Sequence, residues 1–120
     1  MLNSKNYMAL GLMSGTSADG IDVATLVTDG KSKIKLGPSG YYSFSKSFRK
    51  KIKSVFKEKV NIKYLKKKKR IVEIENEFTQ LNFIAINKFL KKNKINKKKI
   101  DVVGFHGQTI SHNPASRYSW

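Results

Sequence analysis

Apolar and polar positions follow two different patterns along this chain, and the change comes near residue 45. In the first part, apolar residues occur in short runs, several of them β-branched and alternating with polar residues. Alternation with a period of two is typical of strands that are buried on one face. A tight-turn signal, Asp29-Gly30, separates the second run from the third. The pattern predicts three consecutive antiparallel strands, at residues 7–13, 21–28 and 32–45, the last of them interrupted at residues 37–40.

After residue 45 the apolar residues recur every three or four positions, which is the spacing of an amphipathic helix. A first helix is expected around Phe48, Ile52 and Val55, with Ser45 or Ser47 as its N-cap. A longer helix is expected to end near Lys92, on the apolar positions Ile71, Ile74, Phe78, Leu81, Ala85 and Phe89.

Residues 100–105 form one more apolar run, which we predict to be a strand. The resulting element order, β-β-β-α-(α)-β, predicts a single α/β domain with a mixed sheet. The expected core includes four aromatic residues: Tyr41, Tyr42, Phe78 and Phe89.

The chain carries a formal net charge of +17, which suggests a nucleic-acid-binding or anionic-surface-binding protein. Its basic residues, however, are 22 Lys and 3 Arg, and phosphate-binding surfaces favour Arg because its planar fork bonds in a bidentate manner. Codons for Lys, Asn and Ile are rich in A and T, so a biased genome also explains the excess. We therefore expect the lysine runs at residues 66–69 and 97–99 to be solvated helix ends. A small basic binding module is the alternative.

Several classes of protein are excluded by the composition or by the N-terminus. No cysteine is present, which excludes disulfides and thiolate metal sites. The two histidines, His106 and His112, lack the neighbouring carboxylates that would indicate a metal site. The N-terminal apolar run is too short for a transmembrane helix, and the regions of a signal peptide are missing. We therefore expect a cytoplasmic protein that does not bind a membrane.

The segment GLMSGTSADGID, at residues 11–22, is rich in glycine, hydroxyl side chains and aspartate. It joins two predicted strands and leads into neither a lysine nor a helix, which excludes a P-loop and a dinucleotide-binding fingerprint. Such a hairpin can present backbone N–H groups to an anion, with hydroxyl donors from Ser14, Thr16 and Ser17. Asp19 and Asp22 would suit a phosphate that is carried with Mg²⁺. The alternative, from the residues alone, is an ordinary hairpin turn.

A second segment, GFHGQTISHNP at residues 104–114, includes the end of the last predicted strand. Together the two segments closely resemble the anhydro-N-acetylmuramic acid kinase family, which belongs to the sugar kinase, Hsp70 and actin superfamily of two-domain ATPases. The resemblance implies a ribonuclease-H-like (actin-like ATPase) N-terminal domain and the cofactors ATP and Mg²⁺. It also implies a phosphate-binding hairpin made of Gly15, Thr16, Ser17, Ala18, Asp19, Gly20, Ile21 and Asp22.

Enzymes of this family open the 1,6-anhydro ring of anhydro-N-acetylmuramic acid with water and transfer the γ-phosphoryl group of ATP to O6. The product is N-acetylmuramic acid 6-phosphate. The resemblance therefore implies a kinase of cytoplasmic peptidoglycan recycling, with an amino sugar as its small-molecule partner and no nucleic acid. A full-length parent could be a homodimer.

The second segment supplies the candidate substrate contacts His106, Gly107, Gln108 and Thr109. His106 follows the predicted strand and is either a ligand contact or a hydrogen-bonded structural histidine. Gln108 and Thr109 either bind sugar hydroxyls or brace the phosphate hairpin.

The chain departs from the family pattern in two ways. Met13 stands where the superfamily usually has an aspartate, two residues before the Gly-Thr pair, so metal contacts are expected from Asp19 and Asp22. Family members are also several times longer, and their water-activating aspartate is expected downstream of Trp120. We therefore expect residues 1–120 to be the N-terminal part of the first domain, without the second domain, incomplete and inactive alone. No residue here is assigned as the catalytic base.

Overall fold

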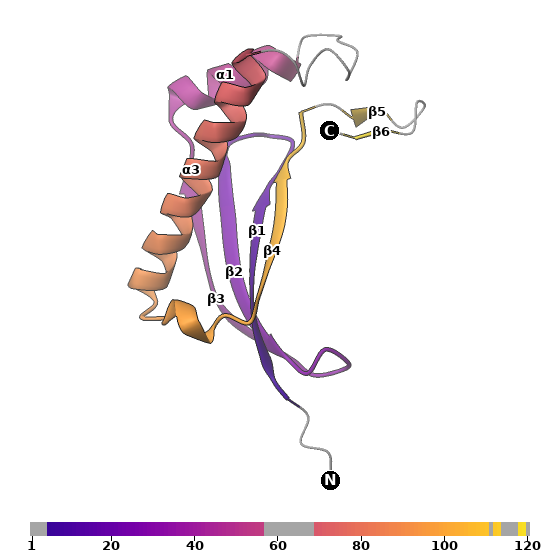
Figure 1. Ribbon diagram of the computed structural model, residues 1–120, viewed down its shortest axis with the longest axis vertical. Helices are drawn as coiled ribbons and strands as arrows, with labels where there is room; N and C mark the ends of the chain where they lie inside the picture. The colour runs from indigo at the N-terminus through magenta and orange to yellow at the C-terminus, as the bar shows by residue number, and fades with distance from the viewer. Residues whose placement is uncertain (1–4, 57–68, 111, 114–117, 120) are drawn as a thin grey trace.

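A four-stranded sheet and two helices make up most of the chain (Figure 1). The computed structural model describes residues 5–56, 69–110, 112–113 and 118–119. The lysine run at residues 66–69 therefore lies outside the described residues, except for Lys69. The elements are β1 (Tyr7–Ser14), β2 (Gly20–Thr28), β3 (Ile34–Ser43), α1 (Lys46–Phe56), α3 (Lys69–Lys92), the 3₁₀ helix η1 (Lys97–Lys99), β4 (Val102–Gln108), β5 (His112–Asn113) and β6 (Tyr118–Ser119).

The strand order in the sheet is β3-β2-β1-β4, with β4 at one edge. The first three strands pair antiparallel in sequence, and β4 pairs parallel with β1. This arrangement confirms the predicted α/β class, the mixed sheet and the β-β-β-α-α-β order. The parallel pair is possible because α1 and α3 carry the chain back to the starting end of β1.

The predicted interruption of the third strand at residues 37–40 is wrong. β3 is continuous, and the irregularity is a register shift opposite Ala24 and Leu26 of β2. There the Thr25 hydroxyl donates a hydrogen bond to the carbonyl of Pro38 (3.1 Å). A bulge of this kind absorbs the Gly-Pro segment without ending the strand.

The turn between β2 and β3 forms as predicted, around Asp29 and Gly30. Gly30 has a φ of 74°, a left-handed conformation that glycine adopts readily. The Asp29 carboxylate accepts hydrogen bonds from the backbone N–H groups of Lys33, Lys31 and Ser32. These bonds, the one from Lys33 first, lower the pKa of Asp29 because they favour its charged form.

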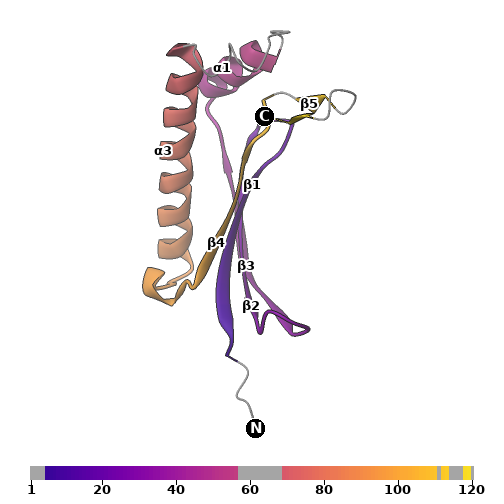
Figure 2. The same cartoon turned by 45° about the vertical axis from the view of Figure 1, so that its right-hand side comes forward.

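Helix α3 runs along one face of the sheet, and α1 lies across the end of the sheet near the β1–β2 connection, as Figures 1 and 2 show. Alternate residues of β1 and β2 point toward them, and these positions are buried together with the apolar stripes of α1 and α3. The largest fully buried apolar side chains are Phe48, Phe89, Leu10, Ile21, Ile52 and Val23. Of the four predicted core aromatics, Phe78 and Phe89 are buried and Tyr42 packs against the core.

Tyr41 is not in the core, contrary to the prediction, and is 54% exposed. It pairs with Asp22 in the sheet and therefore lies on the face away from the helices, whereas its neighbour Tyr42 pairs with the buried Ile21. The period of two places adjacent residues of a strand on opposite faces.

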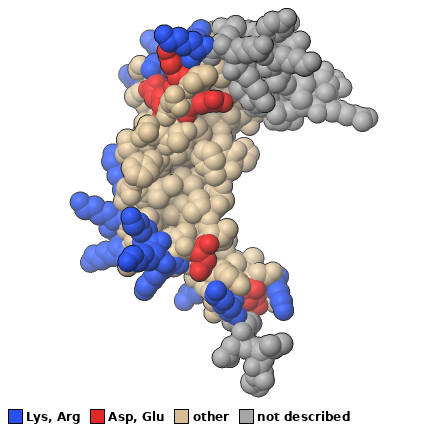
Figure 3. Space-filling model, in the orientation of Figure 1, with Lys and Arg blue, Asp and Glu red and all other residues tan. Residues whose placement is uncertain are grey.

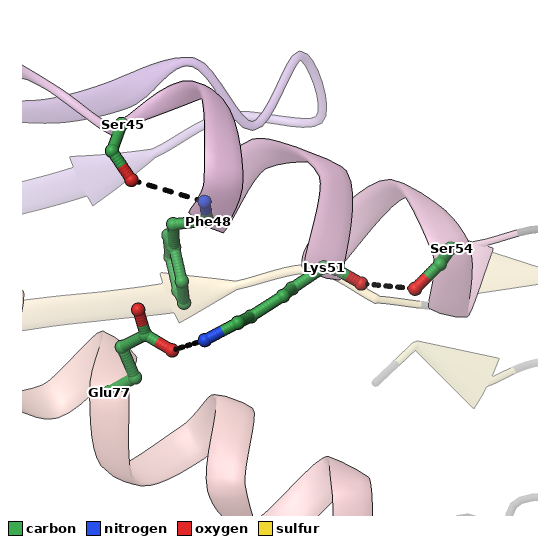
Figure 4. Close-up of polar contacts among 5 residues, drawn as sticks. All are labelled: Ser45, Phe48, Lys51, Ser54 and Glu77. Atoms are coloured by element: carbon green, nitrogen blue, oxygen red, sulfur yellow. Dashed lines mark hydrogen bonds and ion pairs between the residues drawn. The ribbon is translucent and has the colours of Figure 1, made fainter.

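Helix α1 begins where the sequence predicts, and an exposed ion pair and aromatic packing connect it to α3. The Ser45 hydroxyl caps it by accepting a hydrogen bond from the N–H of Phe48 (3.1 Å; Figure 4). The Lys51 ammonium lies 2.6 Å from the Glu77 carboxylate of α3 (Figure 4). The Phe44 ring makes edge contacts with the Phe48 and Phe78 rings.

Lysines gather at the C-terminal end of α3 and along η1, where Figure 3 shows a basic patch. Lys91, Lys92 and the three lysines of η1 are exposed, as expected for a solvated helix end. None of the described helices combines the length and the apolar character that crossing a membrane requires.

Candidate functional site

The connection between β1 and β2 is a five-residue tip, Gly15 to Asp19. The N–H of Ala18 donates to the carbonyl of Gly15 (3.0 Å), which closes a turn over the two residues between them. Ala18 has a φ of 53° and is fully buried, so the core holds this left-handed residue in place.

Thr16 and Ser17 are the exposed residues of that turn. Their backbone N–H groups and their hydroxyls have no protein partner in the part of the chain that the structure describes. Unpartnered donors on one turn are the components of an anion-binding nest. The exposed middle of the turn therefore leaves these donors available to a ligand, as the middle of any solvent-facing β-turn does.

The second half of the tip is fixed to the start of α1. The carbonyl of Asp19 accepts a hydrogen bond from the N–H of Phe44 (2.8 Å). The Arg49 guanidinium lies 3.8 Å from the Asp19 carboxylate and also donates to the carbonyl of Phe44 (3.2 Å). Because both charged side chains are more than a third exposed, we assign this ion pair little stability. Its significance is that it places a cation beside the tip, which the sequence pattern alone did not indicate.

Asp22 lies on the other face of the sheet. In β2 the buried residues Ile21 and Val23 point toward the helices, so Asp22 between them points away and lines a shallow groove with Met13 and His106. Asp19, by contrast, contacts α1 on the helix side. The structure therefore does not bring the two predicted metal ligands together. Within the described ranges, no group of three or more His, Cys, Asp or Glu side chains gathers at any point.

Gly20 and Ile21 belong to β2 and are packed against other residues of the domain. A Cβ added to Gly20 would lie 2.5 Å from the carbonyl oxygen of Tyr42 and 2.7 Å from the ring of Tyr41. Ile21 is 1% exposed in the core. Gly15 differs, since a Cβ there would meet nothing closer than the Ser17 hydroxyl oxygen at 4.0 Å. Of the eight predicted hairpin residues, the structure places Gly15 to Asp19 in the tip and the other three in the strand.

Strand β4 extends further into the second segment than predicted, so His106 lies within the strand and does not follow it. β4 runs to Gln108, so the predicted strand end at residue 105 is three residues too early. A bulge explains the difference, because Leu12 pairs with Phe105 but Ser14 pairs with Gln108. Gly107, inside the bulge, has a φ of 79°, which favours glycine.

His106 is exposed, and its Nδ1 lies 3.1 Å from the carbonyl of the adjacent Gly107. The structure thus shows one local contact for this side chain and leaves its outer side accessible. Thr109 is half-buried, and its carbonyl accepts a hydrogen bond from Gln108.

Gln108 connects the two predicted segments through hydrogen bonds to residues 94 and 93 positions earlier in the chain. Its Oε1 accepts a hydrogen bond from the hydroxyl of Ser14, which is 2% exposed. Its Nε2 donates to the carbonyls of Gly15 (3.0 Å) and Thr109 (3.1 Å). Of the two interpretations for this residue, the geometry favours a brace for the hairpin over a sugar contact.

Comparisons with known proteins identify the same family that the two sequence segments resemble. The family model of anhydro-N-acetylmuramic acid kinase matches residues 7–120. A protein of Bradyrhizobium diazoefficiens named anhydro-N-acetylmuramic acid kinase is 43% identical over 110 residues, which cover 91% of this chain and 30% of that protein. A protein of the same name from Rhodopseudomonas palustris is 40% identical, and the match covers 91% of this chain and 30% of that protein. Another, from Brucella canis, is 39% identical, and the match covers 88% of this chain and 29% of that protein. The chain spans about 30% of the length of these relatives, and it belongs to the anhydro-N-acetylmuramic acid kinase family.

Proposed function

We propose that the tip between β1 and β2 binds the phosphates of ATP in a kinase that acts on an anhydro amino sugar. The observation that carries the proposal is the exposed turn at Thr16 and Ser17, whose N–H groups and hydroxyls lack protein partners in the described structure. Such donors match a triphosphate, since preorganised N–H groups stabilise negative charge without reorganising during the reaction. Relatives named for a kinase supply the independent support.

The domain assigned to this function is the N-terminal part of a ribonuclease-H-like, actin-like ATPase domain, over residues 1–120. The proposed fold is supported by the strand order β3-β2-β1-β4, with β4 parallel to β1 and two helices in the connection from β3 to β4. In this assignment the phosphate hairpin is the turn between β1 and β2.

The proposed reaction uses water to open the 1,6-anhydro ring of anhydro-N-acetylmuramic acid. The water oxygen bonds to C1, the C1–O6 bond breaks, and O6 takes the γ-phosphoryl group of ATP, giving N-acetylmuramic acid 6-phosphate and ADP. A general base must take the proton that the water loses, and no residue of this chain is assigned to that step. The contribution proposed for this chain is positioning and charge stabilisation. Here Thr16 and Ser17 hold the phosphates through backbone and hydroxyl donors.

Mg²⁺ in such a reaction neutralises the charge of the transferring phosphates. It usually keeps several waters and takes one or two carboxylates. Asp19 fits this role because its carboxylate lies at the tip and is 46% exposed. Asp22 does not fit the same ion, because it points to the opposite face of the sheet.

The experiment is a chimera in which residues 1–120 replace the matching segment of the Bradyrhizobium relative. We expect the chimera to form N-acetylmuramic acid 6-phosphate from the anhydro sugar, ATP and Mg²⁺, with ADP in equal amount. A folded chimera that binds no ATP would contradict the proposal. DNA binding that weakens steeply with salt would instead support the lysine-rich surface as the functional one.

A further inference from the structure

We propose that Gln108 is the positioning residue of the phosphate hairpin and makes no contact with the sugar. The inference rests on the proposed function of the tip at Thr16 and Ser17, and it assigns a role to a residue of the second sequence segment. Its basis is the set of hydrogen bonds that Gln108 makes with Ser14, Gly15 and Thr109.

The amide of Gln108 has no donor left for a substrate. A glutamine side chain has two N–H donors, and both are used, one by the carbonyl of Gly15 and one by that of Thr109. The orientation of the amide is fixed by these two carbonyls, because the flipped amide would place its oxygen against both of them. Its oxygen then faces Ser14, whose hydroxyl donates to it.

The bulge in β4 is what directs Gln108 to the hairpin. Phe105 points to the helix side, where its ring lies 6.0 Å from that of Phe78. Regular alternation would therefore turn residue 108 to the opposite face. The extra residue in β4, with Gly107 at a φ of 79°, brings Gln108 back beside the buried Ser14.

Gln108 positions the hairpin through its hydrogen bond to the carbonyl of Gly15. This oxygen accepts two hydrogen bonds, one from the N–H of Ala18 and one from Nε2 of Gln108. Both bonds fix the turn that carries Thr16 and Ser17, so the directions of their N–H groups depend on Gln108. A small displacement of such positioning groups is enough to slow a reaction, since about 1 Å can cost about 10²-fold.

The first test is Gln108→Glu in the chimera described above. The carboxylate cannot donate, and its charge repels the carbonyls of Gly15 and Thr109. We expect kcat/KM for ATP to fall about 10- to 10²-fold, while KM for the anhydro sugar stays unchanged. Gln80→Glu, on the exposed side of α3, is the matched control and should leave both constants unchanged.

Two outcomes would overturn the inference: a raised KM for the sugar with normal ATP constants, which assigns Gln108 to the sugar site, or no change in either. Failure of the proposed function is seen separately, because the chimera with Gln108 intact would then not use ATP at all.

The second test does not depend on activity and uses the 120-residue chain. Amide hydrogen exchange of Ala18 should be faster in Gly107→Ala, which strains the bulge although a Cβ there meets nothing within 4 Å. Gly104→Ala is the control, since it has the same open space and no positive φ. Equal exchange at Ala18 in the two variants would overturn the role of the bulge, even if Gln108→Glu does not fold.

Discussion

The two glycines of the hairpin motif, Gly15 and Gly20, should differ in how their replacement by alanine changes stability. A Cβ on Gly20 would lie 2.5 Å from the Tyr42 carbonyl oxygen and 2.7 Å from the Tyr41 ring. Optimal contacts between heavy atoms are about 3.5–4.0 Å, so each contact is about 1 Å too short. Tyr41 is half-exposed and can move aside, but the Tyr42 carbonyl belongs to the backbone of the β2–β3 pair.

Overpacking of this kind costs about 1–3 kcal/mol, and the lower entropy of the unfolded chain with alanine returns about 0.4–1 kcal/mol. The difference spans about 0–2.6 kcal/mol. Because the Tyr42 carbonyl cannot move aside, we expect Gly20→Ala to lower the free energy of unfolding by about 1–2 kcal/mol, excluding the low end of that range. At about 4–8 °C per kcal/mol for a small domain, the melting temperature should fall by roughly 4–16 °C. Gly15→Ala, whose Cβ meets nothing closer than 4.0 Å, should leave it unchanged or slightly higher.

Thermal unfolding followed by far-ultraviolet circular dichroism at low protein concentration measures both variants. Equal melting temperatures for Gly15→Ala and Gly20→Ala would refute the division of the motif into a ligand-facing tip and a packed strand.

Three further predictions follow from burial and charge. Val103 and Phe105 of the edge strand β4 are 53% and 57% exposed, so we expect the chain to self-associate. Light scattering should give a mass above the 13.7 kDa of the monomer, and a monomeric mass at all concentrations would contradict this. Phe89→Ala, at a fully buried position of α3, should cost about 3–5 kcal/mol in urea unfolding, whereas Phe83→Ala, 64% exposed on the same helix, should change stability by no more than about 0.5 kcal/mol. The lowered pKa of the Asp29 carboxyl stabilises the fold above the unfolded pKa of about 3.9, and this stability is lost as the pH falls through the folded pKa. In Asp29→Asn the free energy of unfolding should therefore fall less steeply on acidification, and the same pH dependence as in the unchanged chain would exclude a contribution of Asp29 to acid stability.

The order of elements could be predicted from the sequence because each has its own period. Alternation in residues 21–28 and helical spacing from Ile71 to Phe89 are local signals, and Ser45 as N-cap is local too. Residues 37–40 misled the prediction, since Gly and Pro signal a break and the structure absorbs them in a bulge opposite Thr25. That choice depends on the partner strand, which no local pattern contains.

The position of the candidate site could be predicted from the sequence, but the hydrogen bonds and the ion pair between its residues could not. The hairpin between the first two strands follows from the motif itself, whereas the faces of Asp19 and Asp22 depend on β2 beginning at Gly20. The contact of Gln108 with Ser14 spans 94 residues and depends on a bulge at Gly107. Arg49 beside Asp19 had no signal in the sequence, because a single basic residue early in a helix is ordinary.

We propose that the tip from Gly15 to Asp19 binds the phosphates of ATP. The measurement that tests it most directly is the KM for ATP and the kcat of the chimera carrying Gly15→Val, beside Lys98→Ala in the exposed lysine patch as control. A Cβ at residue 15 meets nothing closer than 4.0 Å in the free hairpin. The branched side chain of valine would obstruct a phosphate that approaches the backbone. In Gly15→Val we expect kcat/KM for ATP to fall about 10²–10³-fold while sugar binding is retained, and in Lys98→Ala we expect no change. Normal ATP kinetics in Gly15→Val together with impaired kinetics in Lys98→Ala would contradict it.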